Sequence, residues 1–197
     1  MGRSDIPFAQ RMLMKKQAII VHNREQAAKV VMFCNAVALN ELEGIGYKRL
    51  TRYAMRFKRI NDDFYEDPLV SMAHAKHRME QMGMPISGEL FTTCGENALD
   101  TEMLNHSLQA AQIALICAAL AMNEEFQLGR ERQERVSART DELAAQYREE
   151  GIQFLYDKLQ KIGFNIVDGE ARCYLDDDGK PITVKKAINY LGEDFDG

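Results

Sequence analysis

The residues most suited to chemistry in this chain surround a short glycine turn. Leu39 to Glu43 end one helix, Gly44-Ile45-Gly46 turns the chain, and a basic helix begins at Tyr47. Glycines in such a turn let an anion approach the backbone N–H groups at the start of the second helix. Basic side chains then recur at three- and four-residue steps, a spacing that can follow nucleic-acid phosphates. The nucleic-acid-binding candidates are Gly44, Gly46, Lys48, Arg49, Arg52, Arg56 and Arg59.

This turn resembles the hairpin of helix-hairpin-helix DNA-binding modules, whose Gly-hydrophobic-Gly turn offers N–H groups to a phosphate. The resemblance covers residues 39–50, and bulky side chains fill most of that stretch where the family packs a small residue. The alternative is a tight corner between two helices, in which glycine supplies a positive φ. The sequence favours this alternative over phosphate binding.

Other polar groups are weaker site candidates. His74 and His77 lie three residues apart on an expected helix, but no third and fourth metal ligand has suitable spacing, so we expect surface histidines. Asp176-Asp177-Asp178-Gly179 resembles part of a calcium loop, yet residues 183–190 lack the glutamate that would end the loop. A turn is the better interpretation. No metal or other cofactor is predicted.

The cysteines and the catalytic motifs give no sign of an active site. The four cysteines form no CxxC pair, so free and mostly buried thiols are expected. The sequence has no phosphate-binding Gx(4)GK[ST], no GxSxG, no HExxH and no Ser/His/Asp signature. We therefore expect a protein that is not an enzyme.

An internal repeat organises the elements around the turn. Shifted by 83 positions, residues 26–64 fall on 109–147 with 12 identities in 39 positions. The identities include Cys34 with Cys117, Asn40-Glu41 with Asn123-Glu124, and the three arginines 49, 52 and 56 with 132, 135 and 139. After a three-residue slip, residues 78–84 match residues 158–164. Self-similarity in one order indicates duplication of one structural unit.

Each repeat is expected to form three helices, which predicts a mainly all-α fold. An Ala-rich apolar helix (24–43 and 104–126) should form the central packing pair, because alanine lets two helix backbones approach closely. A long amphipathic helix follows (47–65 and 130–150), and a shorter helix (68–82 and 150–162) ends at Gly83 or Gly163. A separate N-terminal helix, about 7–21, is expected before the first repeat.

The predicted domain boundaries follow from this repeat. Residues 1–84 form an N-terminal helical unit, in which the first repeat covers about 24–84, and 85–103 a turn-rich linker with a short strand near 89–94. Residues 104–164 form the second repeat. Residues 165–197 form an appendage, in which strands 165–167 and 170–175 make a β-hairpin before a turn and a short helix over 183–191.

Charge is distributed unevenly along a chain of ordinary composition. The net charge is −5, yet residues 1–60 carry twelve Lys/Arg against four Asp/Glu, so the remainder carries −13. Such asymmetry indicates a partner that responds to charge. The N-terminus lacks the apolar core of a signal peptide and no segment has the apolar length of a membrane span, so a cytoplasmic location without membrane contact is expected.

The pattern from Asn40 to Leu50, repeated in altered form from Asn123 to Gln133, is similar to that of small helical proteins encoded in prophages of Gram-positive bacteria. Some phage proteins of this kind inhibit host defences, including CRISPR nucleases. The resemblance implies a binding protein of phage or mobile-element origin, in the host cytoplasm, with a protein target such as a CRISPR effector nuclease. A DNA- or RNA-binding accessory factor and a structural protein of a virion or complex are the alternatives.

The acidic end of the chain would serve the inhibitor hypothesis, because carboxylates can mimic a row of phosphates and be steered to a basic surface. The partner-binding candidates are Asp176, Asp177, Asp178, Glu193 and Asp194. The core is expected to close within a monomer. A homodimer would form through apolar side chains of the N-terminal helix, namely Phe8, Met12, Leu13, Ile19 and Ile20.

Overall fold

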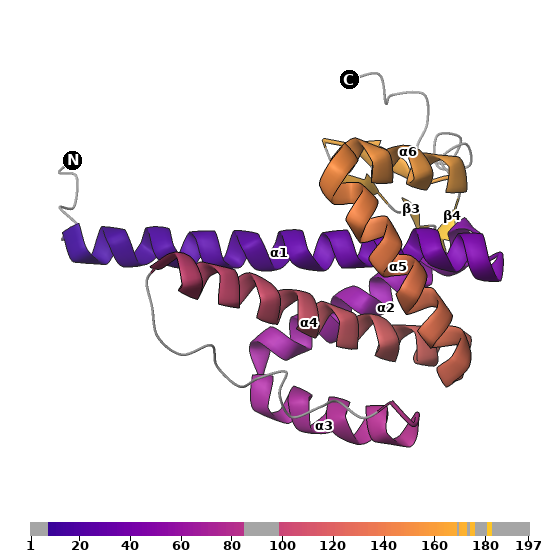
Figure 1. Cartoon of the computed structure of the whole chain (residues 1–197), viewed down its shortest axis with the longest axis horizontal. Coiled ribbons are helices and arrows are strands. Elements are labelled where there is room, and N and C mark those ends of the chain that lie inside the picture. Colours follow the sequence, from indigo (N-terminus) through magenta and orange to yellow (C-terminus); the bar gives the residue numbers. More distant parts are fainter. Residues whose placement is uncertain (1–7, 85–98, 169, 173, 176–180, 183–197) are drawn as a thin grey trace.

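Long segments without glycine or proline give the protein its helical architecture (Figure 1). The computed structural model describes residues 8–84, 99–168, 170–172, 174–175 and 181–182. The fold is mainly all-α with small antiparallel hairpins, as the sequence predicts. The helices are α1 (Phe8–Glu43), α2 (Tyr47–Glu66), α3 (Pro68–Gln81), α4 (Leu99–Phe126), α5 (Arg130–Glu150) and α6 (Ile152–Ile162).

The expected break between an N-terminal helix and the first repeat is wrong. Residues 8–43 form one continuous helix of 36 residues. No glycine or proline occurs in this segment, so nothing interrupts the backbone hydrogen bonds where the break was placed. The helix expected over 104–126 also begins earlier, because α4 starts at Leu99 inside the predicted linker. The rest of that linker and the strand expected near 89–94 lie outside the described residues.

The other helix boundaries agree closely with the sequence, because distinct signals mark them. Asp67 caps α3 with its side chain, which accepts a hydrogen bond from the N–H of Val70, and Pro68 takes the first helical position. Gly151, with φ 81° and ψ −177°, separates α5 from α6. Gly163 ends α6 in the left-handed conformation.

The core is built around the packing of α1 against α4, the Ala-rich pair that the sequence predicts. Alanines of both helices are buried where they pack, Ala36 and Ala38 on α1 and Ala114 and Ala121 on α4, as are the single cysteines Cys34 and Cys117. One apolar face of α2 covers this pair with five buried residues at helical spacing: Leu50, Tyr53, Phe57, Ile60 and Phe64. Each first helix also packs on the second helix of the other repeat, α1 on α5 and α4 on α2.

The appendage begins with the expected β-hairpin. Strand β1 (Asn165–Val167) pairs antiparallel with β2 (Glu170–Arg172). The long second strand expected over 170–175 is divided, because β3 (Tyr174–Leu175) pairs instead with β4 (Pro181–Ile182) in a separate sheet. The helix expected over 183–191 lies outside the described residues. Over the part of the chain that is described, no helix is both long and apolar enough to cross a membrane.

Candidate functional site

The glycine turn between α1 and α2 has the same backbone as its counterpart between α4 and α5. Gly44 has a φ of 63°, and Gln127, which lies 83 residues later, keeps a positive φ of 54°. Gly46 and Gly129 then start their helices with extended backbone, at φ −82° and −72°. The residue between them is buried in each turn, as Ile45 or Leu128. A helix–helix corner anchored by one apolar side chain accounts for this geometry in both copies.

Most arginines of the basic stripe on α2 face the end of α4. Arg52 Nε lies 2.7 Å from a carboxylate oxygen of Glu125, and Arg56 Nε lies 3.3 Å from one of Glu124. Arg49 stacks on the ring of Phe126, 5.0 Å from its centre. These side chains therefore take part in the packing of α2 on α4.

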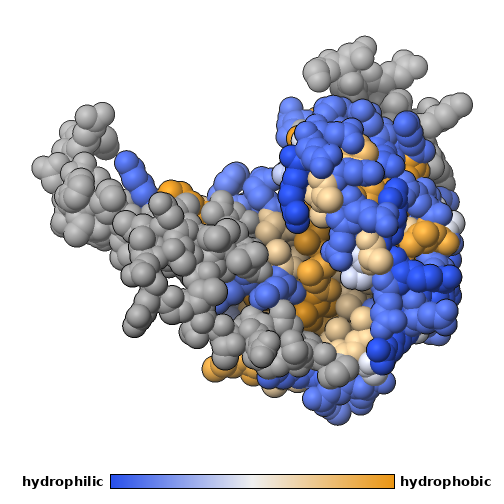
Figure 2. Space-filling view, in the orientation of Figure 1, coloured by the Kyte–Doolittle hydropathy of each residue, from blue (hydrophilic) through white to orange (hydrophobic). Residues whose placement is uncertain are grey.

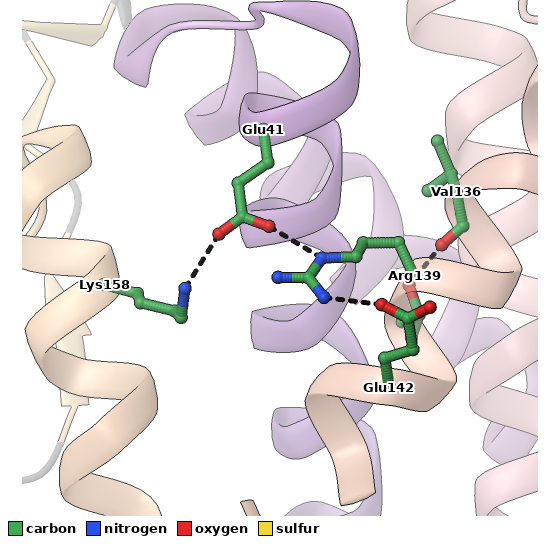
Figure 3. Close-up of polar contacts among 6 residues, drawn as sticks. Glu41, Val136, Arg139, Glu142 and Lys158 are labelled. Carbon is green, nitrogen blue, oxygen red and sulfur yellow. Dashed lines mark hydrogen bonds and ion pairs between the residues drawn. The ribbon is translucent and has the colours of Figure 1, made fainter. Parts of the chain in front are cut away.

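The second repeat makes the reciprocal contacts with the end of α1. Glu41 accepts hydrogen bonds of 2.8 Å from Arg139 of α5 and from Lys158 of α6 (Figure 3). Glu124 is held in the same way by Arg56 and by Arg78 of α3, the latter at 3.0 Å. Arg56 and Arg139, and Glu41 and Glu124, are equivalent under the 83-residue shift. Each half thus supplies a carboxylate that the basic side chains of the other half bind.

Basic neighbours lower the pKa values of two carboxyls at the end of α1, Glu41 and Glu43. Burial opposes ionisation of Glu41, but hydrogen bonds from Lys158 and Arg139 outweigh it and lower the pKa of this carboxyl. A hydrogen bond from Arg132, together with the charges of Arg132 and Arg135, lowers the pKa of Glu43. The side chain of Glu43 is only 6% exposed, so these arginines compensate a nearly buried charge.

Two basic candidates of α2, Lys48 and Arg59, form no ion pair with α4 in the described structure, and neither does the neighbouring Lys58, which is not one of the candidates. Lys58 forms an i, i+4 ion pair with Asp62 at 2.6 Å. Lys48 and Arg59 are exposed, and within the described structure neither forms an ion pair. Gly44 and Gly46 are exposed too, with open space where a Cβ would lie. Arg49, Arg52 and Arg56 of the stripe therefore contact α4, although Arg49 and Arg52 also face solvent. Lys48 and Arg59 face solvent alone.

The nucleophilic groups of the core are poorly suited to catalysis. Burial raises the pKa of both the Cys34 and the Cys117 thiol to about 12, so both are protonated near neutral pH. Burial also raises the pKa of the Tyr53 phenol. His74 and His77 are exposed, and His77 lies 3.0 Å from the side-chain amide of Gln81. The described residues contain no group of three or more potential metal ligands.

Two features with functional potential escaped the sequence interpretation. The equivalent carboxylates Glu41 and Glu124, which bind basic side chains of the other half, were visible only as repeated Asn-Glu pairs. A hollow between α3, α4 and α5, lined by Asn35 and Gln133 among apolar residues, was not predicted. Its signals were a polar residue inside the apolar run of α1 and a glutamine at the position that Leu50 takes in the first repeat. The acidic candidates Asp176, Asp177, Asp178, Glu193 and Asp194 lie outside the described residues.

No family model, curated protein or solved structure matches this chain.

Proposed function

We propose that this chain is a non-enzymatic accessory protein of phage or mobile-element origin that binds a protein target. The target we propose is the basic nucleic-acid channel of a host nuclease, so that the protein acts as an anti-CRISPR-like inhibitor. The observation that carries this choice is the pairing of Arg52 and Arg56 with Glu125 and Glu124. Because these arginines already have carboxylate partners inside the molecule, they are less available to phosphates.

The charge balance supports the same proposal. The chain carries −5 overall and −13 beyond residue 60. Its basic excess lies in the first 60 residues, where Arg49, Arg52 and Arg56 of the stripe contact α4. A net negative protein is repelled by nucleic acid and attracted to basic surfaces, which raises its association rate with such a partner. The runner-up function, a DNA- or RNA-binding accessory factor, would have to use Gly44 to Lys48 and Arg59.

A pull-down from cells that express CRISPR effector nucleases, with and without nuclease treatment, tests the proposal. We expect a protein target that stays bound after nucleic acid is digested. Loss of every partner on digestion would instead favour the nucleic-acid-binding factor. A nuclease assay with the captured effector then tests inhibition, and undiminished cleavage at saturating protein would contradict it.

Charge variants separate the two surfaces. Neutralising Asp176, Asp177, Asp178, Glu193 and Asp194 to the corresponding amides should slow association with the basic target, most clearly at low salt. The matched basic variant is Lys48→Glu with Arg59→Glu, which leaves the pairs to Glu124 and Glu125 intact. Inhibition should survive this second variant. Tight, salt-sensitive DNA binding that Lys48→Glu with Arg59→Glu abolishes would instead favour the nucleic-acid-binding factor over the inhibitor.

A further inference from the structure

A hollow of about 420 Å³ lies between α3, α4 and α5. Its walls are mainly apolar and include Met79 and Met84 beside α4 residues Leu115 and Met122. Figure 2 shows apolar surface in the hollow beside α5, with hydrophilic side chains along its border. The volume falls within the range of small-molecule sites, about 300–1,000 Å³. Methionine side chains adapt to irregular shapes and make favourable contacts with aromatic rings.

Two polar side chains that line this hollow are almost completely buried. Asn35 is 2% exposed and Gln133 is 1% exposed. Their amide nitrogens donate to the carbonyl oxygens of Val31 and Leu128, at 3.3 and 2.8 Å. Because a carbonyl oxygen can only accept, these bonds fix which end of each amide is the nitrogen. Asn35 Oδ1 and Gln133 Oε1 are left without a hydrogen-bond partner in the described structure.

Aromatic side chains occupy the corresponding place in the other half of the molecule. There Tyr47 packs edge-to-face on Phe164, with ring centres 4.9 Å apart, and Phe33 packs on Tyr156 at 6.1 Å. In the repeat alignment, Arg130 is equivalent to Tyr47, Met84 to Phe164 and Ile116 to Phe33. All three replacements line the hollow. The hollow is therefore a place where one half of the molecule lacks the rings that fill its counterpart.

We propose that the hollow between α3, α4 and α5 binds a small, flat aromatic molecule that carries an N–H donor. The ring takes the space that Tyr47 and Phe164 fill in the other half, in contact with the methionines. On binding, the side-chain amide of Gln133 or Asn35 turns toward the ring, and its oxygen, which is buried and without a partner in the described structure, accepts a hydrogen bond from the N–H. This ligand site goes beyond the protein-binding function and does not depend on it.

Indole is the probe that tests this proposal. Methyl NMR signals of Met79, Met84 and Met122 should shift on titration, with a dissociation constant of about a millimolar or lower. The methyl of Met55, which is exposed on α2 and lies outside the hollow, is the internal control and should not move. Shifts of Met55 equal to those of the three methionines, or no shifts at all, would overturn the site.

Two variants place in the hollow the residues found at the equivalent positions of the other half, namely Phe33 and Phe164 in the first variant and Leu50 in the second. Ile116→Phe with Met84→Phe should fill the space and abolish the indole-induced shifts. Gln133→Leu, which copies Leu50, removes one acceptor and should weaken indole binding about tenfold. 1-Methylindole, which lacks the donor, should bind the wild-type protein equally weakly.

The titrations can contradict the ligand site in two ways. Indole binding that is unchanged in the filled variant contradicts the site, provided that circular dichroism shows this variant to be folded. If it does not fold, Gln133→Leu and 1-methylindole decide alone. Equal affinities for indole and 1-methylindole, together with no loss in Gln133→Leu, would show that the two oxygens bind water only and would overturn the proposal.

Discussion

At the scale of single residues, two carboxylates join the halves of this protein. Glu41 binds Arg139 and Lys158, and Glu124 binds Arg56 and Arg78. Each carboxylate sits at the end of a first helix, and its partners come from the second and third helices of the other repeat. The repeated Asn-Glu pair marked these residues in the sequence, but the pattern along one helix cannot reveal a partner about a hundred residues away.

Removing either carboxylate's charge should destabilise the fold to a similar extent. We expect Glu41→Gln and Glu124→Gln each to lower the free energy of unfolding by about 1 kcal/mol, because both ion pairs are only partly shielded from water. Urea denaturation measures this. Glu66→Gln, at the exposed end of α2, is the matched control and should change little. A loss confined to one of the two variants would contradict the reciprocal arrangement.

The lowered pKa values of Glu41 and Glu43 predict loss of stability in acid. Both carboxyls are held below their ordinary pKa of 4.5 in the folded protein, so the unfolded chain takes up protons first as the pH falls. The contribution of these two carboxylates to the free energy of unfolding is present above pH 4.5 and is lost progressively below it. The melting temperature of Glu41→Gln with Glu43→Gln should therefore vary less between about pH 5 and pH 2 than that of the wild-type protein. If the melting temperatures of the variant and of the wild-type protein changed equally with pH, these two carboxyls would not have lowered pKa values in the folded protein.

At the scale of elements, local signals predicted most of the fold. The apolar spacing from Leu50 to Phe64 predicted the buried face of α2, and Gly83, Gly151 and Gly163 lie at helix ends. The error at residues 22–23 arose because a polar stretch can be the exposed face of a continuing helix. Local patterns also could not show how α3, α4 and α5 leave a hollow between them, because its volume depends on how side chains far apart in the chain meet.

The two helix corners offer a paired test of backbone strain. Gln127 holds a positive φ that costs a non-glycine residue about 1 kcal/mol or more, whereas Gly44 holds a similar φ without that cost. Gln127→Gly should therefore raise the free energy of unfolding by about 1 kcal/mol, and Gly44→Gln should lower it by a comparable amount. Because open space surrounds the Cβ position at Gly44, a steric clash would not complicate this comparison. Chemical denaturation measures both changes, and a stabilising effect of Gly44→Gln would contradict the argument.

At the scale of the whole molecule, the duplication that the sequence indicates predicts an approximate two-fold relation between the halves. The matching corners and the pairs Arg139–Glu41 and Arg56–Glu124 follow from the 83-residue shift, and the third helices match after the three-residue slip. We expect residues 24–84 and 104–164 to superpose as one three-helix unit in a crystal structure. The largest side-chain differences should lie at Arg130, Ile116 and Met84, where the hollow replaces aromatic packing. Units that cannot be superposed would remove the basis for comparing the two halves.

The first turns of α1, which extend beyond the other helices, predict how the protein associates with itself (Figure 1). Met14 and Val21 are 53% and 48% exposed, and their seven-residue separation places them on one face of this helix. Pairing two such faces would bury both side chains, so the homodimer, which is the alternative to a monomer, should form through this face of α1 at micromolar concentration. Met14→Glu with Val21→Glu should give a monomer with unchanged helix content, because neither side chain belongs to the core. Light scattering measures the mass, and Leu69→Glu, which changes a side chain that is 85% exposed on α3, is the control that should remain dimeric. A stable tetramer, or a wild-type monomer at every concentration, would contradict pairing through α1.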